Sequence, residues 1–161
     1  MAFLLDADTF IAAKDSYYGM DFCPAYWDWL AQANIAGRVF SIEKVKGELV
    51  AGADALSTWA SAKDDHFFLA PDAATLPAFA TVSNWASGAG YPPAAINTFL
   101  SAADYYLVAQ ALALQYTVVT RERPGATKKI KIPDACIALG VTCVTPFELL
   151  RAERARFVLQ L

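Results

Sequence analysis

Short apolar runs that alternate with helical segments constrain the fold of this chain more than any other feature. FLLDAD at residues 3–8 and TVVT at residues 117–120 read as buried strands. Three further runs read as strands: 66–70, 129–132 and 141–144. Strands separated by helices are typical of βαβ units, so we predict an α/β fold, a three-layer α/β/α sandwich with a mainly parallel central sheet. A chain of 161 residues has room for one hydrophobic core, and we expect one domain over residues 1–161.

Capping and helix-breaking residues place the expected helices. Ser41 is expected to cap a helix in which Ile42, Val45 and Leu49 follow helical spacing. Ser101 is expected to cap a second helix, rich in Ala, Leu and Val. Further helices are expected at about 9–18, 24–36 and 54–63, within 71–88, and from residues 133 and 146 onward.

Hydrophobic residues make up 57% of the chain and the mean hydropathy is +0.32, which raises the question of a membrane segment. The longest run without charge, residues 73–103, is interrupted by prolines, glycines and asparagines, so it reads as helix, loop and helix. MAFLL at the N-terminus has no basic residue and meets Asp6 at once, unlike a signal peptide. We therefore expect no membrane association and a cytoplasmic location.

Cysteine and histidine usage narrows the kinds of site that the chain can build. The three cysteines, Cys23, Cys136 and Cys143, are an odd number without C-x-x-C spacing, so reduced thiols are expected rather than disulfides or a zinc site. His66 is the single histidine and is expected to flank a strand. Any metal must therefore be held by oxygen ligands.

Charge is distributed unevenly along the chain. Residues 1–120 carry 5 Lys or Arg against 12 Asp or Glu, whereas residues 121–161 carry 8 against 4. Five basic residues within eleven positions form a candidate phosphate-binding segment: Arg121, Arg123, Lys128, Lys129 and Lys131. A solvated loop is the alternative interpretation of the same charges. Lys14 is a weaker candidate, because it can equally pair with an acid.

Several acids are expected at strand ends or helix starts. If the first strand continues to residue 8, Asp6 and Asp8 project on the same side where it ends. Four others come from distant parts of the chain: Glu48, Asp104, Glu122 and Asp134. In an open α/β sheet such positions can converge on one pocket, and oxygen ligands of this kind suit Mg²⁺ or Mn²⁺. Asp104 and Asp134 also have a simpler interpretation, as acids that favour helix starts.

The motifs LLDAD followed by FI, SIEKVKGEL, AADYYLVAQALA and VVTRE occur in the order typical of PIN-domain proteins. The chain resembles this superfamily over almost its whole length, and within it a toxin ribonuclease of the VapC kind. YYGMDFCPAYWDWL and KIKIPDAC resemble the DUF4411 branch, PIN-like proteins of uncharacterised function.

The resemblance implies that Asp6, Glu48 and Asp104 match the first three PIN acids, and that Glu122 stands where many relatives have aspartate. All four would be catalytic Mg²⁺ or Mn²⁺ ligands in RNA phosphodiester hydrolysis that yields 5′ phosphate and 3′ hydroxyl ends. Asp8 is a weaker ligand candidate, because relatives commonly have asparagine there. The resemblance also implies a small protein antitoxin. A homodimer is expected too, partly because Trp59 and Trp85 are expected at the surface.

Two rival interpretations remain from the sequence. The same start of the chain resembles haloacid-dehalogenase-like phosphatases, in which Asp6 would be the nucleophile and Asp8 the acid or base, with Asp64 and Asp65 as a later acidic pair. Alternatively, the fold is kept without activity, as a module that binds RNA or a protein. Metal-dependent thermal stabilisation would separate an active site from an abandoned one.

Overall fold

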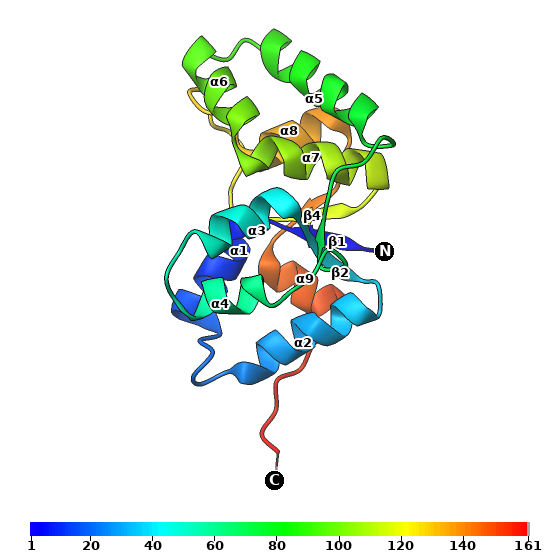
Figure 1. Ribbon diagram of the computed structural model, residues 1–161. Coiled ribbons are helices and arrows are strands. Elements are labelled where there is room, and N and C mark those ends of the chain that lie inside the picture. Colours follow the sequence, from blue (N-terminus) through cyan, green and yellow to red (C-terminus); the bar gives the residue numbers. More distant parts are fainter. Residues whose placement is uncertain (161) are drawn as a thin grey trace.

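The computed structural model describes residues 1–160 as five parallel strands with helices on both faces of the sheet (Figure 1). The strands are β1 (Phe3–Leu5), β2 (Val39–Ile42), β3 (Phe68–Leu69), β4 (Thr117–Val119) and β5 (Cys143–Val144). Their order in the sheet is β3-β2-β1-β4-β5, and every neighbouring pair is parallel. The predicted three-layer α/β/α class is confirmed.

The helices connect the strands and form the outer layers. They are α1 (Ala7–Ala12), which continues into the π-helical turn η1 (Ala13–Tyr17), α2 (Pro24–Ile35), α3 (Glu43–Val50), α4 (Ala55–Ser61), α5 (Leu76–Gly88), α6 (Pro93–Ser101), α7 (Ala103–Leu114), α8 (Ile132–Leu139) and α9 (Pro146–Ala152). Helices α7 and α8 lie on one side of the sheet with α5 and α6 beyond them, whereas α2 and α9 lie on the other side (Figure 1).

The strand order creates a switch point at the centre of the sheet. The chain moves outward from β1 through β2 to β3 and then returns to β4 on the other side of β1. Because parallel crossovers are right-handed, successive helices fall on opposite faces of the sheet once the direction of travel reverses. In open α/β sheets, sites form at the carboxyl ends of the strands at such a point. Here that point lies just after Leu5 of β1 and Val119 of β4.

Aromatic side chains form much of the core on the α2 side of the sheet. Phe10 of α1 is fully buried, and its ring lies 5.7 Å from that of Trp59 and 6.2 Å from that of Phe67. Trp27 of α2 contacts Trp59 edge to face at 5.0 Å. Burial of several such rings contributes most of the hydrophobic free energy and holds α1 rigidly below the switch point.

Three local predictions are wrong. Ser41 is not a helix cap: it lies fully buried in β2, which was not predicted, and its hydroxyl donates to the carbonyl of Leu5 at 2.7 Å. Ser101 ends α6 instead of starting α7, and its hydroxyl donates to the carbonyl of Asn97. Residues 129–131 form a loop and not a strand, and α8 begins at Ile132. For Ser41 a tertiary contact overrides the local pattern, whereas the Ser101 hydroxyl bonds within its own helix.

The single histidine and the cysteines lie as predicted. The three cysteines are free thiols, and His66 flanks β3, two residues before its first residue Phe68. Trp59 and Trp85 are half-buried against the core, so they do not supply the exposed aromatic surface that was expected for a homodimer. Among residues 1–160, no helix has the length and apolar character that a bilayer crossing requires.

Candidate functional site

Asp6 is the buried acid at the centre of the switch point. It follows β1 directly, is only 5% exposed, and caps the first turn of α1. Its Oδ1 accepts from the backbone N–H of Thr9 at 2.8 Å and from the Thr9 hydroxyl at 2.6 Å, and its Oδ2 accepts from the Thr120 hydroxyl at 2.5 Å. Both carboxylate oxygens are therefore held in place by β1, α1 and the residue that follows β4.

Burial dominates the electrostatics of Asp6. It raises the pKa of this carboxyl from 3.8 to about 6, although the hydrogen bonds from Thr120 and Thr9 oppose the shift. The charge of Asp8 raises the pKa slightly further. A carboxyl with such a pKa is mostly ionised at pH 7, and a nearby cation would stabilise its buried charge.

Asp8 does not stand beside Asp6, contrary to the strand-based prediction. Strand β1 ends at Leu5, so Asp8 already belongs to the first turn of α1. Its side chain is exposed, and one of its oxygens lies 3.0 Å from a guanidinium nitrogen of Arg121. The ion pair joins the ends of β1 and β4 across the switch point, and it gives Asp8 a structural role independent of a metal.

Asp104 lies in the first turn of α7, as predicted, and its pKa is the most strongly raised among these acids. Burial raises it from 3.8 to about 7, followed by the charges of Glu122, Asp6 and Glu48, while Lys131 lowers it. The start of a helix favours the charged form of Asp104, but this does not offset the rise in its pKa. Three of the other acids that were predicted to converge therefore lie near enough to Asp104 for their charges to raise its pKa.

Glu48 reaches the site from the last turns of α3. Its side chain is exposed overall, but neighbouring groups displace enough water from the carboxyl to raise its pKa. The backbone N–H of Ala103, the first residue of α7, opposes the shift. Glu48 therefore lies near the start of the helix that carries Asp104.

Glu122 follows β4 and has two hydrogen-bonded neighbours. Its Oε2 accepts from the backbone N–H of Ile132 at 2.8 Å, at the start of α8, and its own N–H donates to the Thr120 hydroxyl at 3.1 Å. Glu122 and Asp104 line one cavity of about 340 Å³, together with residues of α6 and of the loop before α8. Glu122 therefore has both a structural bond and access to the site.

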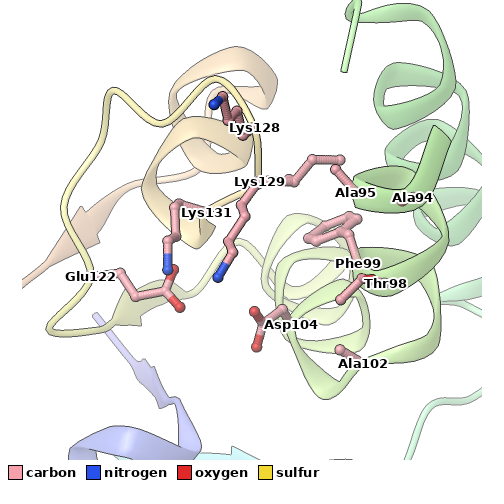
Figure 2. Close-up of a pocket in the computed structure, with 11 residues that line it drawn as sticks. Ala94, Ala95, Thr98, Phe99, Ala102, Asp104, Glu122, Lys128, Lys129 and Lys131 are labelled. Carbon is pink, nitrogen blue, oxygen red and sulfur yellow. The ribbon is translucent and has the colours of Figure 1, made fainter. Parts of the chain in front are cut away.

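Lysines of the basic loop, residues 121–131, enter the same cavity. Lys128, Lys129 and Lys131 are among its lining residues. Figure 2 shows the amino groups of Lys129 and Lys131 directed toward the space between Glu122 and Asp104, whereas that of Lys128 points away. The cavity therefore presents carboxylates at its base and amino groups at its rim, an arrangement that can receive a metal ion with a phosphate group.

The four acids fit Mg²⁺ or Mn²⁺ by their chemistry. Their ligands would all be carboxylate oxygens, which these cations prefer, and none of the four forms an ion pair with another residue among residues 1–160. No group of three or more His, Cys, Asp or Glu side chains in this part of the chain stands at metal-ligand spacing. Binding would therefore draw the carboxylates closer together than they lie here.

The other predicted basic residues divide between two places. Arg121 and Arg123 line a separate cavity on the β5 side of Glu122. Lys14 lies in η1 and pairs with Asp15 at 2.7 Å and with Asp54 at 2.8 Å. Of its two interpretations, the one in which it pairs with an acid is therefore confirmed. Lys14 lines neither cavity.

Asp134 supports the basic loop instead of capping its own helix. The N-cap of α8 is Lys131, and the Asp134 Oδ1 accepts from the backbone N–H of Gly125 at 2.9 Å. Gly125 has φ +107°, a conformation that L side chains adopt rarely. The second oxygen, Oδ2, is buried and has no hydrogen-bond partner among the described residues. Asp134 and Glu122 together fix the loop at two points.

Thr9 and Thr120 are the site residues that the sequence analysis missed. Both are buried, and both donate to Asp6. Thr9 stands three residues after Asp6, the ordinary spacing for a helix N-cap contact, so a local signal existed. No local signal pointed to Thr120, because its contact spans 114 residues.

Thr120→Val is expected to destabilise the protein by about 1–3 kcal/mol, because it leaves Asp6 Oδ2 and the Glu122 N–H without their partner. The substitution should also raise the pKa of Asp6 above 6, because the hydrogen bond that it removes stabilises the charged carboxylate. Urea unfolding and NMR titration of Asp6 would measure both effects. Thr117→Val, at the other end of β4, is the control; equal stability of the two variants would contradict the role of Thr120.

The family comparison covers nearly the whole chain. The family described as Domain of unknown function (DUF4411) matches residues 3–157, and the protein belongs to this family. No curated protein matched the sequence. The matched residues include every acid, lysine and threonine of the site described above.

Proposed function

We propose that this protein is a PIN-domain endoribonuclease of the VapC kind, which hydrolyses RNA phosphodiester bonds with Mg²⁺ or Mn²⁺. The observation that carries the proposal is the cavity in which Asp104 and Glu122 meet the lysines of the basic loop. Acids alone would repel a phosphate, and lysines alone would not hold a divalent cation. Their presence in one cavity matches a substrate that brings phosphate to a metal ion.

Each group has a separate task in this proposal. Asp6, Glu48, Asp104 and Glu122 hold the cation, and the threonine contacts keep Asp6 oriented. The cation would lower the pKa of a bound water and stabilise the leaving 3′ oxygen. Lys129 and Lys131 neutralise the phosphate that lies over the acids, while Arg121 and Arg123 extend the positive surface beyond Glu122.

The proposal extends to partners and compartment. As the toxin of a type II pair, the protein would be held inactive by a small antitoxin laid across the cavity. Three free thiols agree with action in the reducing cytoplasm.

The phosphatase alternative has less support. Its acid or base, Asp8, is exposed and engaged by Arg121 at 3.0 Å. Asp64 and Asp65 come before β3, at the end of the sheet opposite the switch point, and Asp64 accepts from the backbone N–H of His66. The inactive-module alternative differs from the proposal only in metal binding and turnover, so those are what the test must measure.

The test is cleavage of end-labelled single-stranded RNA by the purified, partner-free protein with Mg²⁺, Mn²⁺ or EDTA, alongside calorimetric titration of Mn²⁺. We expect Mn²⁺ binding, cleavage that EDTA stops, and products with 5′ phosphate and 3′ hydroxyl ends. Mn²⁺ binding without cleavage of any RNA would contradict the ribonuclease proposal. A protein that neither binds Mn²⁺ nor cleaves RNA would be the inactive module.

A further inference from the structure

A second cavity of about 340 Å³ lies on the β5 side of Glu122, and the proposed reaction leaves it unused. Its walls come from the residues after β4, from α8, and from β5 with the start of α9. Glu122 lines both this cavity and the acidic one. The two cavities are therefore neighbours along the carboxyl edge of the sheet.

One wall of the second cavity is apolar. It is formed by Pro133 and Ile137 of α8 and by Val141 before β5. Ile137 is 70% exposed and lines this cavity, so its side chain is accessible to a ligand. A flat, planar ligand can cover this wall and remove it from water.

The polar groups of the cavity combine guanidinium and carboxylate. Arg121 is already engaged by Asp8, but Arg123 forms no ion pair with any residue between 1 and 160. Glu148 uses Oε1 to accept from the backbone N–H of Thr145 at 3.1 Å, and no hydrogen bond to its other oxygen occurs in this part of the chain. The cavity thus offers a bidentate donor and a charged acceptor beside an apolar wall.

We propose that this second cavity binds a guanine base of the RNA, next to the nucleotide whose phosphate lies over Asp104 and Glu122. The inference rests on the proposed ribonuclease function. Guanine presents O6 and N7 as acceptors, which suit the fork of Arg123, and N1–H and N2–H₂ as donors, which suit the carboxylate of Glu148. Adenine and the pyrimidines lack this combination, and the apolar wall covers the face of the base.

The position of Glu122 explains why the base and the phosphate belong to one RNA strand. An RNA strand whose phosphate lies among Lys129, Lys131 and the acids passes Glu122 at the boundary of both cavities. Its neighbouring base then lies over the second cavity without crossing other protein surface. The lysines would bind any RNA, whereas Arg123 and Glu148 would select the sequence.

The test compares binding of two fluorescent uridine oligonucleotides, one with a single central guanine and one with adenine, measured by anisotropy with EDTA so that nothing is cleaved. We expect about tenfold tighter binding of the guanine oligonucleotide. Arg123→Lys keeps the charge but loses the bidentate fork, and Glu148→Gln keeps the acceptor for Thr145; in both variants the two oligonucleotides should bind with equal affinity. Arg156→Ala, an exposed arginine outside both cavities, should leave the preference intact.

Failure of this inference is distinguishable from failure of the proposed function. Equal binding of the two oligonucleotides, or a preference that survives Arg123→Lys, overturns the guanine pocket even where metal-dependent cleavage occurs. A wild type that binds neither oligonucleotide in EDTA overturns the guanine pocket, whereas the cleavage assay with Mn²⁺ decides the proposed function separately. If the preference is absent and Arg123→Lys instead weakens binding of a purified antitoxin, the cavity is a protein-binding site. Cleavage next to guanines by the wild type would agree with the binding result.

Discussion

Asp6→Asn is expected to reduce metal-dependent RNA cleavage by about 100-fold or more, the largest functional effect of any single change. A bound cation contributes several kcal/mol to stabilisation of the transition state, and each 1.4 kcal/mol corresponds to a factor of ten in rate. Asparagine keeps an oxygen for the Thr9 contacts, and the Thr120 hydroxyl can accept from the new amide, so the site geometry is preserved. The measurement is the single-turnover cleavage rate with Mn²⁺.

Stability separates this result from simple unfolding. Without metal, Asp6→Asn should be more stable than the wild type at pH 8 by about 1–2 kcal/mol, because a buried charge has been removed. Asp28→Asn, an exposed carboxylate on α2, is the control and should keep full activity. Cleavage by Asp6→Asn at the wild-type rate would remove Asp6 from the catalytic residues.

Metal-free protein is expected to lose about 2–4 kcal/mol of stability between pH 5 and pH 8. In the unfolded chain the carboxyls of Asp6 and Asp104 have a pKa near 3.8, whereas in the folded protein their pKa values are about 6 and about 7. At pH values between the unfolded and folded pKa of each acid, the folded state binds more protons than the unfolded state. The free energy of unfolding therefore falls as pH rises. Urea unfolding at several pH values in EDTA measures this loss.

Divalent cations and a variant supply the controls for this pH dependence. Millimolar Mn²⁺ should restore much of the lost stability at pH 8, because it binds the charged, folded form. Asp104→Asn should remove more than half of the pH dependence, since the pKa of Asp104 is raised more than that of Asp6. Stability that is constant or rises from pH 5 to pH 8 would show that folding does not raise the pKa values of Asp6 and Asp104.

The pattern of elements was largely predictable because it depends on local sequence. Buried apolar runs and helix-breaking residues gave four of the five strands and the parallel α/β class. The missed strand, β2, lies in RVFSIEK, where Ser41 resembled a helix cap. Its hydroxyl is instead satisfied by Leu5 of the neighbouring strand, a contact that no local pattern reveals.

The acids were predictable as a set, but not their individual surroundings. The charges of Glu122, Asp6 and Glu48 raise the pKa of Asp104, so these acids lie near it, but their role as metal ligands stays a prediction. Asp8 was expected beside Asp6, yet it faces Arg121, because the strand stops one residue before Asp6. A shift of one or two residues in a strand end changes which side chains are buried together.

The sequence by itself determined four of the five strands, the set of candidate acids and the position of the basic segment, because each depends on residue type and short spacing. Only the tertiary structure decided that Thr120 orients Asp6, that Asp134 holds the basic loop, and that Glu122 separates two cavities. The Asp6–Thr120 contact joins residues 114 positions apart, and the boundary at Glu122 depends on the packing of β4, α8 and β5. Such distances follow from the return crossover to β4 and from sheet register, which no local window of sequence contains.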